Sequence, residues 1–365
     1  MTTPHVPSNS SEHTASSRPA PESVSERPAE TAPTGAFAAK DRLLLFALLG
    51  VLVLAFALVG SNVAANHAPK PHQLPLGVIG TPLVVSAEAA SLEHRAPGAF
   101  QIHAYSSLAA AKEAILHRDV YGALQPASTP SLLVASAASP AVEALLQKTF
   151  TAAAQKQGKT LVVRDLVPLP SSDSRGATTF SMLISLLVIA IISSAIIYLL
   201  GRHRPPPVRL AAMVAIGVCA GLVSALLTTV IVGAFHGHFL AVWGVATLFV
   251  LAVGLPIAAF QVFVGASGIA IGALMFLVIG NPASGGSSAP ELLPGFWRAL
   301  SQLLPPGAAM TAMRDVVYFH GHGMTHALLV LSIYAILGAT TVFTLQILRT
   351  PTRTARAGLS TATRQ

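Results

Sequence analysis

Residues 180–200 read FSMLISLLVIAIISSAIIYLL and contain no charged side chain. About 20 consecutive apolar residues are enough for a helix to cross the hydrocarbon core of a bilayer. A charge near the centre of such a helix costs about 3 kcal/mol, so membrane spans rarely contain Asp, Glu, Lys or Arg. The stretch therefore predicts a transmembrane helix, and it decides how the rest of the chain is interpreted.

Five further apolar runs lie on either side of this stretch. They are Leu43 to Ala64, Leu210 to Phe235, Leu240 to about Phe260, about Gly265 to Ile279, and Ala327 to Leu348. The runs that begin at Leu240 and at about Gly265 are continuous with each other. We place the boundary between them at Gln261 to Ser267, and the rival division is a boundary at Gly254 and Pro256. Together the runs predict an α-helical polytopic membrane protein with six transmembrane helices.

The composition agrees with a membrane protein and excludes several other classes. Hydrophobic residues make up 53% of the chain and charged residues 10%, whereas soluble proteins carry about 25% charged residues. We interpret the net charge of +8 as a sign of membrane topology, and we expect membrane lipids and no nucleic acid as partners. Cys219 is the only cysteine, which excludes an intramolecular disulfide.

The basic residues that flank the apolar runs predict the orientation. With the N-terminus inside, nine lie on inner flanks: Lys40, Arg42, Arg202, Arg204, Arg209, Arg349, Arg353, Arg356 and Arg364. Four lie on outer flanks: Lys70, Arg175, Arg298 and Arg314. The positive-inside rule then places both termini in the cytoplasm of a cell-membrane protein. A cleaved signal peptide is the alternative for the first run, but the long leader before it favours an uncleaved anchor.

The segment between the first and second runs has the pattern of a small α/β domain. Short β-type runs occur at 76–79, 100–105, 120–124, 132–135 and 160–166, and helical patterns at about 86–94, 107–117 and 140–157. Alternating strands and helices predict a small sheet covered by helices. Because it follows the first span, we expect this domain outside the cytoplasm.

These patterns predict a linear order of domains. It consists of a disordered cytoplasmic tail at 1–40, a first transmembrane helix at 41–65, an extracytoplasmic α/β domain at 66–175, a five-helix membrane domain at 176–348 and a cytoplasmic tail at 349–365. Within the membrane domain, segment 281–323 is too short for a domain and too apolar for a free loop. Its pieces 294–304 and 307–319 predict re-entrant or interfacial helices, with an ordered surface loop as the alternative. The aromatic residues expected at headgroup level are Phe296, Trp297, Tyr318 and Phe319.

Part of this segment also carries a resemblance to a known family. It reads GNPASG at 280–285, APELLP at 289–294 and LPPG at 304–307. With the order of spans, it resembles the membrane subunit of type-2 ABC exporters, and more closely the phage-infection-protein-like branch with an enlarged first external loop. The resemblance covers residues 43–348. It implies a permease that forms a homo- or heterodimer, is driven by a separate cytoplasmic ABC ATPase, and moves a lipid, drug or polymer outward.

The resemblance makes the segment a candidate re-entrant or gating site. The residues concerned are Asn281, Pro282, Glu291, Pro294, Trp297, Pro305, Pro306, Gly307, Arg314 and Asp315. We interpret the adjacent charges Arg314 and Asp315 as a surface pair at a helix end, with substrate gating as the alternative.

Motifs for catalysis and for metal binding are weak or absent. The chain has no phosphate-binding loop of the Gly-x-x-x-x-Gly-Lys-Ser/Thr type, no His-Glu-x-x-His and no Gly-x-Ser-x-Gly, so we predict neither an enzyme nor a cofactor. The weak metal candidates are the histidines His236, His238, His320, His322 and His326. A membrane-anchored receptor or scaffold, whose external domain binds a surface ligand without transport, is the alternative to the exporter.

Overall fold

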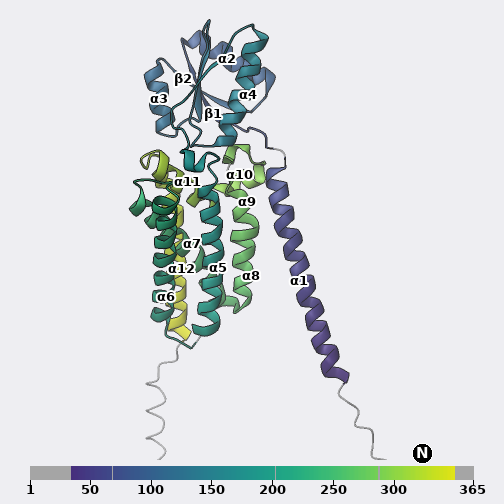
Figure 1. Cartoon of the computed structure of the whole chain (residues 1–365). Coiled ribbons are helices and arrows are strands. Elements are labelled where there is room, and N and C mark those ends of the chain that lie inside the picture. The colour runs from purple at the N-terminus through teal and green to yellow at the C-terminus, as the bar shows by residue number, and fades with distance from the viewer. Residues whose placement is uncertain (1–33, 68, 202, 287, 350–365) are drawn as a thin grey trace, which may run out of the picture. The chain divides into compact units, whose positions relative to one another are not determined.

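The computed structural model describes residues 34–67, 69–201, 203–286 and 288–349 (Figure 1). The chain divides within helix α1 (Thr34–Asn66) into two compact units, one ending at Val53 and the other beginning at Leu54. The second unit contains the sheet and all the other described helices. Most of the predicted tails, at 1–33 and 350–365, lie outside the described residues.

Helix α1 begins earlier than the first apolar run. The interval predicted as a disordered tail extends to residue 40, whereas the helix starts at Thr34. The residues Ala36, Ala38 and Ala39 explain the difference, because alanine has the highest helix propensity and lengthens a helix that the apolar run already nucleates.

A mixed five-stranded sheet follows α1. Its strands are β1 (Leu74–Ile79), β2 (Phe100–Tyr105), β3 (Gly122–Gln125), β4 (Ser131–Val134) and β5 (Val162–Asp165), in the spatial order β2-β1-β3-β4-β5. All neighbouring pairs are parallel except β3 and β4, which form an antiparallel hairpin. The helices are α2 (Pro82–Arg95), α3 (Leu108–Leu116) and α4 (Pro140–Lys156). Each predicted strand and helix of this region is present, which confirms the α/β pattern.

Helices cover both faces of the sheet. Leu124 and Leu132 point toward the face covered by α2 and α4, whereas their neighbours Ala123 and Leu133 point toward α3. This is the two-residue period of a strand that is buried on both sides. Ser107 and Ser139 cap α3 and α4, because each hydroxyl oxygen accepts a hydrogen bond from the backbone N–H three residues later.

The remaining helices form a bundle. They are α5 (Thr178–Gly201), α6 (Pro206–Ala225), α7 (Phe239–Val264), α8 (Ser267–Gly272), α9 (Asn281–Ala283), α10 (Gly295–Ser301), α11 (Pro305–Tyr318) and α12 (Met324–Arg349). The π-helical segments η2 (Leu226–Ile231) and η3 (Ala273–Gly280) continue α6 and α8, and the short 3₁₀ helices are η1 (Ser171–Asp173) and η4 (Pro290–Leu292). Asp173 starts α5, because its carboxylate accepts hydrogen bonds from the N–H groups of Ala177 and Thr178.

Five helices of the described part are long and apolar enough to cross a membrane. They cover Leu44–Asn66, Thr178–Gly201, Pro206–Ile231, Phe239–Val264 and Met324–Leu345. The fifth predicted span, at about 265–279, corresponds to a shorter apolar helix, Ser267–Ala283. Large apolar side chains such as Ile192, Val230 and Ile336 are exposed on the bundle surface, as expected for helices that face lipid. The chain is therefore a mostly helical protein with the features of a multi-pass membrane protein.

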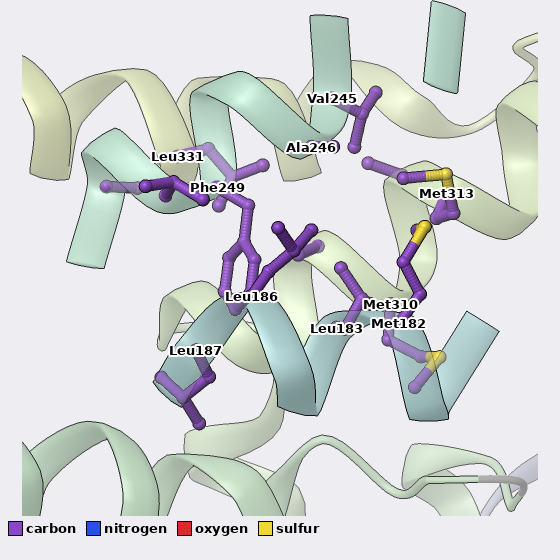
Figure 2. Close-up of a cluster of buried hydrophobic side chains, with 14 of the residues drawn as sticks. Met182, Leu183, Leu186, Leu187, Val245, Ala246, Phe249, Met310, Met313 and Leu331 are labelled. Carbon is purple, nitrogen blue, oxygen red and sulfur yellow. The ribbon is translucent and has the colours of Figure 1, made fainter. Parts of the chain in front are cut away.

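Helix α7 forms the centre of the bundle and packs against α5, α6, α8, α11 and α12. Figure 2 shows part of the core that results, in which Phe249 of α7 lies among Leu186 of α5, Met310 of α11 and Leu331 of α12. Helix α7 ends at Val264, and Gly265 has a φ of +68°, so the helix break lies within the predicted interval of 261–267. The rival division is wrong, because Gly254 and Pro256 both lie inside α7.

Glycines allow these helices to approach closely. Gly217 and Gly221 of α6 face Thr247 of α7, and Gly338 of α12 lies against the backbone of Leu255. A Cβ atom at Gly338 would lie 2.6 Å from the carbonyl carbon of Leu255, closer than side chains normally come. Small residues are used in this way where membrane helices cross.

We expect Gly338→Ala to lower the free energy of unfolding by about 1–3 kcal/mol, because the methyl group must push α12 away from α7. Gly244→Ala on α7 is the matched control. A Cβ atom there meets no neighbour, and alanine favours a helix over glycine by about 1 kcal/mol. Unfolding of the detergent-solubilised chain with increasing SDS measures both changes. Equal stabilities of the two variants would contradict the close packing of α7 and α12.

Candidate functional site

The predicted re-entrant segment connects the bundle to the α/β domain. Helix α11 is almost entirely buried and packs against α5, α7 and α12. The stretch before α10 and the turn after α11 contact the α/β domain instead. Ala289 and Leu292 join the core under α2 and α4, and Phe319 joins the core under α3. The surface-loop alternative for this segment is therefore wrong.

The aromatic residues of the segment differ in their surroundings. Phe296 is 63% exposed and packs edge-on against Trp297, which is compatible with the predicted headgroup position. Phe319 is 1% exposed within the core of the α/β domain, so the headgroup prediction is wrong for this residue. Tyr318 is half-buried, and its ring packs edge-on against Phe235 of the bundle. Burial in a protein core has replaced the expected lipid contact, because the α/β domain covers this end of α11.

Arg314 and Asp315 do not form the surface pair that their adjacency predicts. Both are buried, with 6% and 0% of the residue exposed. The carboxylate of Asp315 pairs with Arg118, which follows α3 in the α/β domain, at 3.0 Å between Nε and Oδ1. The guanidinium of Arg314 donates to the carbonyl oxygens of Ser288 at 3.1 Å and Gly286 at 2.8 Å. Neighbouring residues on a helix point in different directions, so the two charges have separate partners.

Burial changes the proton affinity of both groups. Burial and, to a smaller extent, the nearby positive charge of Arg118 together lower the pKa of the Arg314 guanidinium to about 10. Arg314 is therefore still protonated at neutral pH. Burial raises the pKa of Asp315 to about 6, although Arg118, Arg314 and His322 each act to lower it. Desolvation of the Asp315 carboxylate therefore outweighs the positive charges around it.

A second group of contacts lies around Glu291. Its carboxylate accepts a hydrogen bond from the hydroxyl of Tyr121 at 2.8 Å, and burial is the main cause that raises the pKa of that phenol. The backbone carbonyl of Glu291 accepts a hydrogen bond from the N–H of His72 at 2.9 Å. Arg298 of α10 donates to the carbonyl of His72 at 3.0 Å. The segment is thus fixed to the start of β1 as well as to the loop after α3.

A cavity of about 220 Å³ lies between these contacts. Its polar lining comes from both parts of the unit and consists of Arg118, Tyr121, Ser284, Glu291, Gln302, Thr311, Arg314 and Asp315. Several of these groups bond to one another, because Thr311 donates to Gln302 and Tyr121 donates to Glu291. The arrangement forms a polar, charge-balanced junction between the α/β domain and the bundle.

The other predicted residues of the segment support its backbone and lie outside this junction. Asn281 and Pro282 form the short helix α9, and Pro294 precedes α10. Pro305, Pro306 and Gly307 form the first turn of α11 and are buried. A side chain at Gly307 would overlap the carbonyl oxygen of Ser301. Trp297 lies on α10 beside Phe296 and does not line the cavity.

The structure does not bring the five histidines together as a metal site. Among the residues that the structure describes, no group of three or more His, Cys, Asp or Glu side chains can hold a metal ion. His236 contacts the carbonyl of Gly233 in its own turn. The ring of His322 instead meets His117 of the α/β domain edge-on, with centroids 4.4 Å apart. The positions of the five histidines therefore do not support the metal hypothesis.

Sequence patterns did not identify the partners that the α/β domain contributes. Arg118 lies between His117 and Asp119 in a polar loop, where a charged residue is ordinarily solvated. A backbone φ of +72° distinguishes it in the structure, because residues other than glycine rarely adopt that conformation. Tyr121 follows the same loop, and no motif links it to Glu291, 170 positions later.

No family model, curated protein or solved structure matches this chain. The fold itself therefore defines the class: a helical protein whose described residues include five candidate membrane spans, with a mixed α/β domain inserted after the first of them.

Proposed function

We propose that this chain is the membrane subunit of a type-2 ABC exporter, with six spans, both termini in the cytoplasm and the α/β domain outside the cell membrane. The observation that carries the proposal is the order and packing of the helices. Two short helices, α10 and α11, stand directly before the last span, and α11 is buried among α5, α7 and α12. A short helical pair at this position is what the resemblance of residues 280–307 implies.

The helix Ser267–Ala283 serves as the fifth span in this proposal. Its 17 residues rise about 25 Å, a little less than the roughly 30 Å of hydrocarbon in a bilayer. The buried helix α11 follows it through α10 and lies among the other spans. A short span completed by re-entrant helices is tolerated where the irregular backbone between them is buried in protein. The buried residues Asn281, Ser284 and Leu292 support that arrangement.

The distribution of charge supports the orientation. Arg204 lies in the turn between α5 and α6 and Arg209 in the first turn of α6, at the opposite end of α5 from Asp173 and the α/β domain. Basic residues remain on the cytoplasmic side of membranes, so this turn faces the cytoplasm and the α/β domain faces outward. In an exporter, the turn is the surface available to a separate ATPase, since the chain lacks a phosphate-binding loop.

Copurification tests the proposal. We expect the full chain, extracted from its native membrane in mild detergent, to retain an ABC-type ATPase in stoichiometric amount and to hydrolyse ATP. Reversing the exposed charge of the turn with Arg204→Glu should release the ATPase, whereas Arg175→Glu on the other flank should not. Recovery of a surface ligand without any nucleotide-binding protein would contradict the exporter and favour the receptor or scaffold.

Deleting the α/β domain does not separate these two functions. Removal of 66–171 would take away Arg118 and Tyr121 and expose Phe319 and Leu292 to water. Segment 281–323 would then lose its contacts with the α/β domain, so a loss of ligand binding could result from a loss of stability instead. Point variants in the turn between α5 and α6 avoid that difficulty, because they leave the junction intact.

A further inference from the structure

The contact between Arg118 and Asp315 lies where α11 turns into α12. The turn contains three residues with left-handed backbone, His320, Gly321 and Gly323, with φ values of 53°, 84° and 85°. Gly323 lies beside the ion pair, where a Cβ atom would meet Oδ2 of Asp315 at 3.1 Å. A turn of this kind absorbs changes in backbone angle, so movement at Asp315 is passed to the start of α12.

The Asp315 side chain of the ion pair is buried and that of Arg118 is 15% exposed, and the pair has few hydrogen bonds. In the described part of the chain, both carboxylate oxygens of Asp315 and Nη1 of Arg118 lack a hydrogen-bond partner. A buried pair contributes to stability only where further hydrogen bonds compensate for the water that both charges lost. The strained backbone of Arg118 adds to the cost of the contact. Unlike Arg314 and Glu291, whose side chains are hydrogen-bonded, the carboxylate of Asp315 is therefore held by charge alone.

We propose that the Arg118–Asp315 pair is a proton-sensitive latch between the α/β domain and the turn into α12. In the latched state the two side chains are in contact and the carboxylate is buried. In the open state the loop after α3 moves away from the turn, and the carboxylate is hydrated. The proposal goes beyond the exporter function and does not depend on it.

The direction of the pH response follows from the burial of Asp315. In the latched state its pKa is about 6, whereas the carboxyl of a hydrated aspartate has a pKa near 3.8. The latched state therefore binds the proton more tightly. Lowering the pH from above 6 to about 4 favours the latched state, by up to about a hundredfold. Raising the pH charges the buried carboxylate and favours opening.

Other charged groups lie around Asp315, and they determine which control variants the pH measurement needs. Arg118 faces it from the α/β domain, Arg314 from α11 and His322 from the turn, and all three lower its pKa. His117 of the α/β domain contacts His322 edge-on beside the same turn. The double variant His117→Gln and His322→Gln therefore separates the contribution of these rings from that of Asp315.

Distance measurements between spin labels test the latch in the full chain. Cysteines replace the exposed residues Ala109 on α3 and Thr325 on α12, in a Cys219→Ser background. We expect two distances at pH 7.5 and a shift toward the shorter one at pH 5. Asp315→Asn should show the shorter distance at both pH values, because asparagine, like the protonated carboxyl, carries no charge that burial would strip of water. Asp119→Asn, at an exposed neighbour of Arg118, should respond as the wild type does.

Three results would overturn the latch. One is a wild-type distance distribution that is the same at pH 5 and pH 7.5. Another is a pH response that persists unchanged in Asp315→Asn. The third is a response that disappears in the double variant His117→Gln and His322→Gln, since the histidine pair would then be the proton-binding group. The wild-type measurement and the histidine variant decide the question even where Asp315→Asn does not fold.

Discussion

Phe319→Ala is expected to lower the free energy of unfolding of the α/β domain by about 3–5 kcal/mol. Phe319 belongs to the turn after α11, yet its ring is 1% exposed and packs in the core under α3. Removing the ring leaves a cavity in that core and weakens the connection to the bundle. Chemical unfolding of the detergent-solubilised chain, followed by proteolysis of the α/β domain, measures the effect.

Phe296→Ala is the control for this substitution. It removes the same ring from the same segment at a side chain that is 63% exposed, and its expected effect is within about 0.5 kcal/mol. Equal losses for the two variants would mean that the turn does not complete the α/β core.

Arg314→Met should cost about 2–5 kcal/mol, because it leaves the carbonyls of Gly286 and Ser288 buried without their donor. Methionine fills much of the same volume, so the loss reports chiefly on the hydrogen bonds. Arg314→Lys keeps the charge but cannot donate from two fixed positions, and it should recover only part of the loss. Unfolding in SDS provides the measurement.

The exposed residue Arg175 supplies the matched control for Arg314. Arg175→Met makes the same chemical change at the surface and should alter stability by less than about 0.5 kcal/mol. A stability of Arg314→Met close to that of the wild type would contradict the buried role of the guanidinium. Gly286 and Ser288 would then hold their positions without it.

Sequence patterns predicted the elements well because hydrophobic periodicity and length are local properties. The apolar run at 180–200 corresponds to α5, and the β-type run at 100–105 corresponds to β2. The break between α7 and α8 was predicted from Gly265, whose left-handed backbone no β-branched residue would adopt easily. The sheet order and the antiparallel β3–β4 pair were not predicted, since strand pairing depends on contacts between distant residues.

The candidate site was predicted only in part, for a related reason. Glu291, Arg314 and Asp315 stood out because charges are rare in an apolar region. Their partners did not, because Arg118 and Tyr121 lie in a polar domain where such residues are common. Adjacency in the sequence suggested that Arg314 pairs with Asp315, whereas the α/β domain that covers the end of α11 provides a closer partner for the carboxylate. Isolated charges beside apolar helices therefore indicate burial more reliably than they indicate their partners.

The side of the membrane on which the α/β domain lies tests the central claim most directly. Single cysteines at Gln101 on β2 and at His203 between α5 and α6, in the Cys219→Ser background, can be labelled in intact cells with a maleimide that does not cross membranes. The proposed topology predicts labelling of position 101 in intact cells and of position 203 only after permeabilisation. Labelling of both positions from the same side would contradict the topology, and the exporter proposal with it.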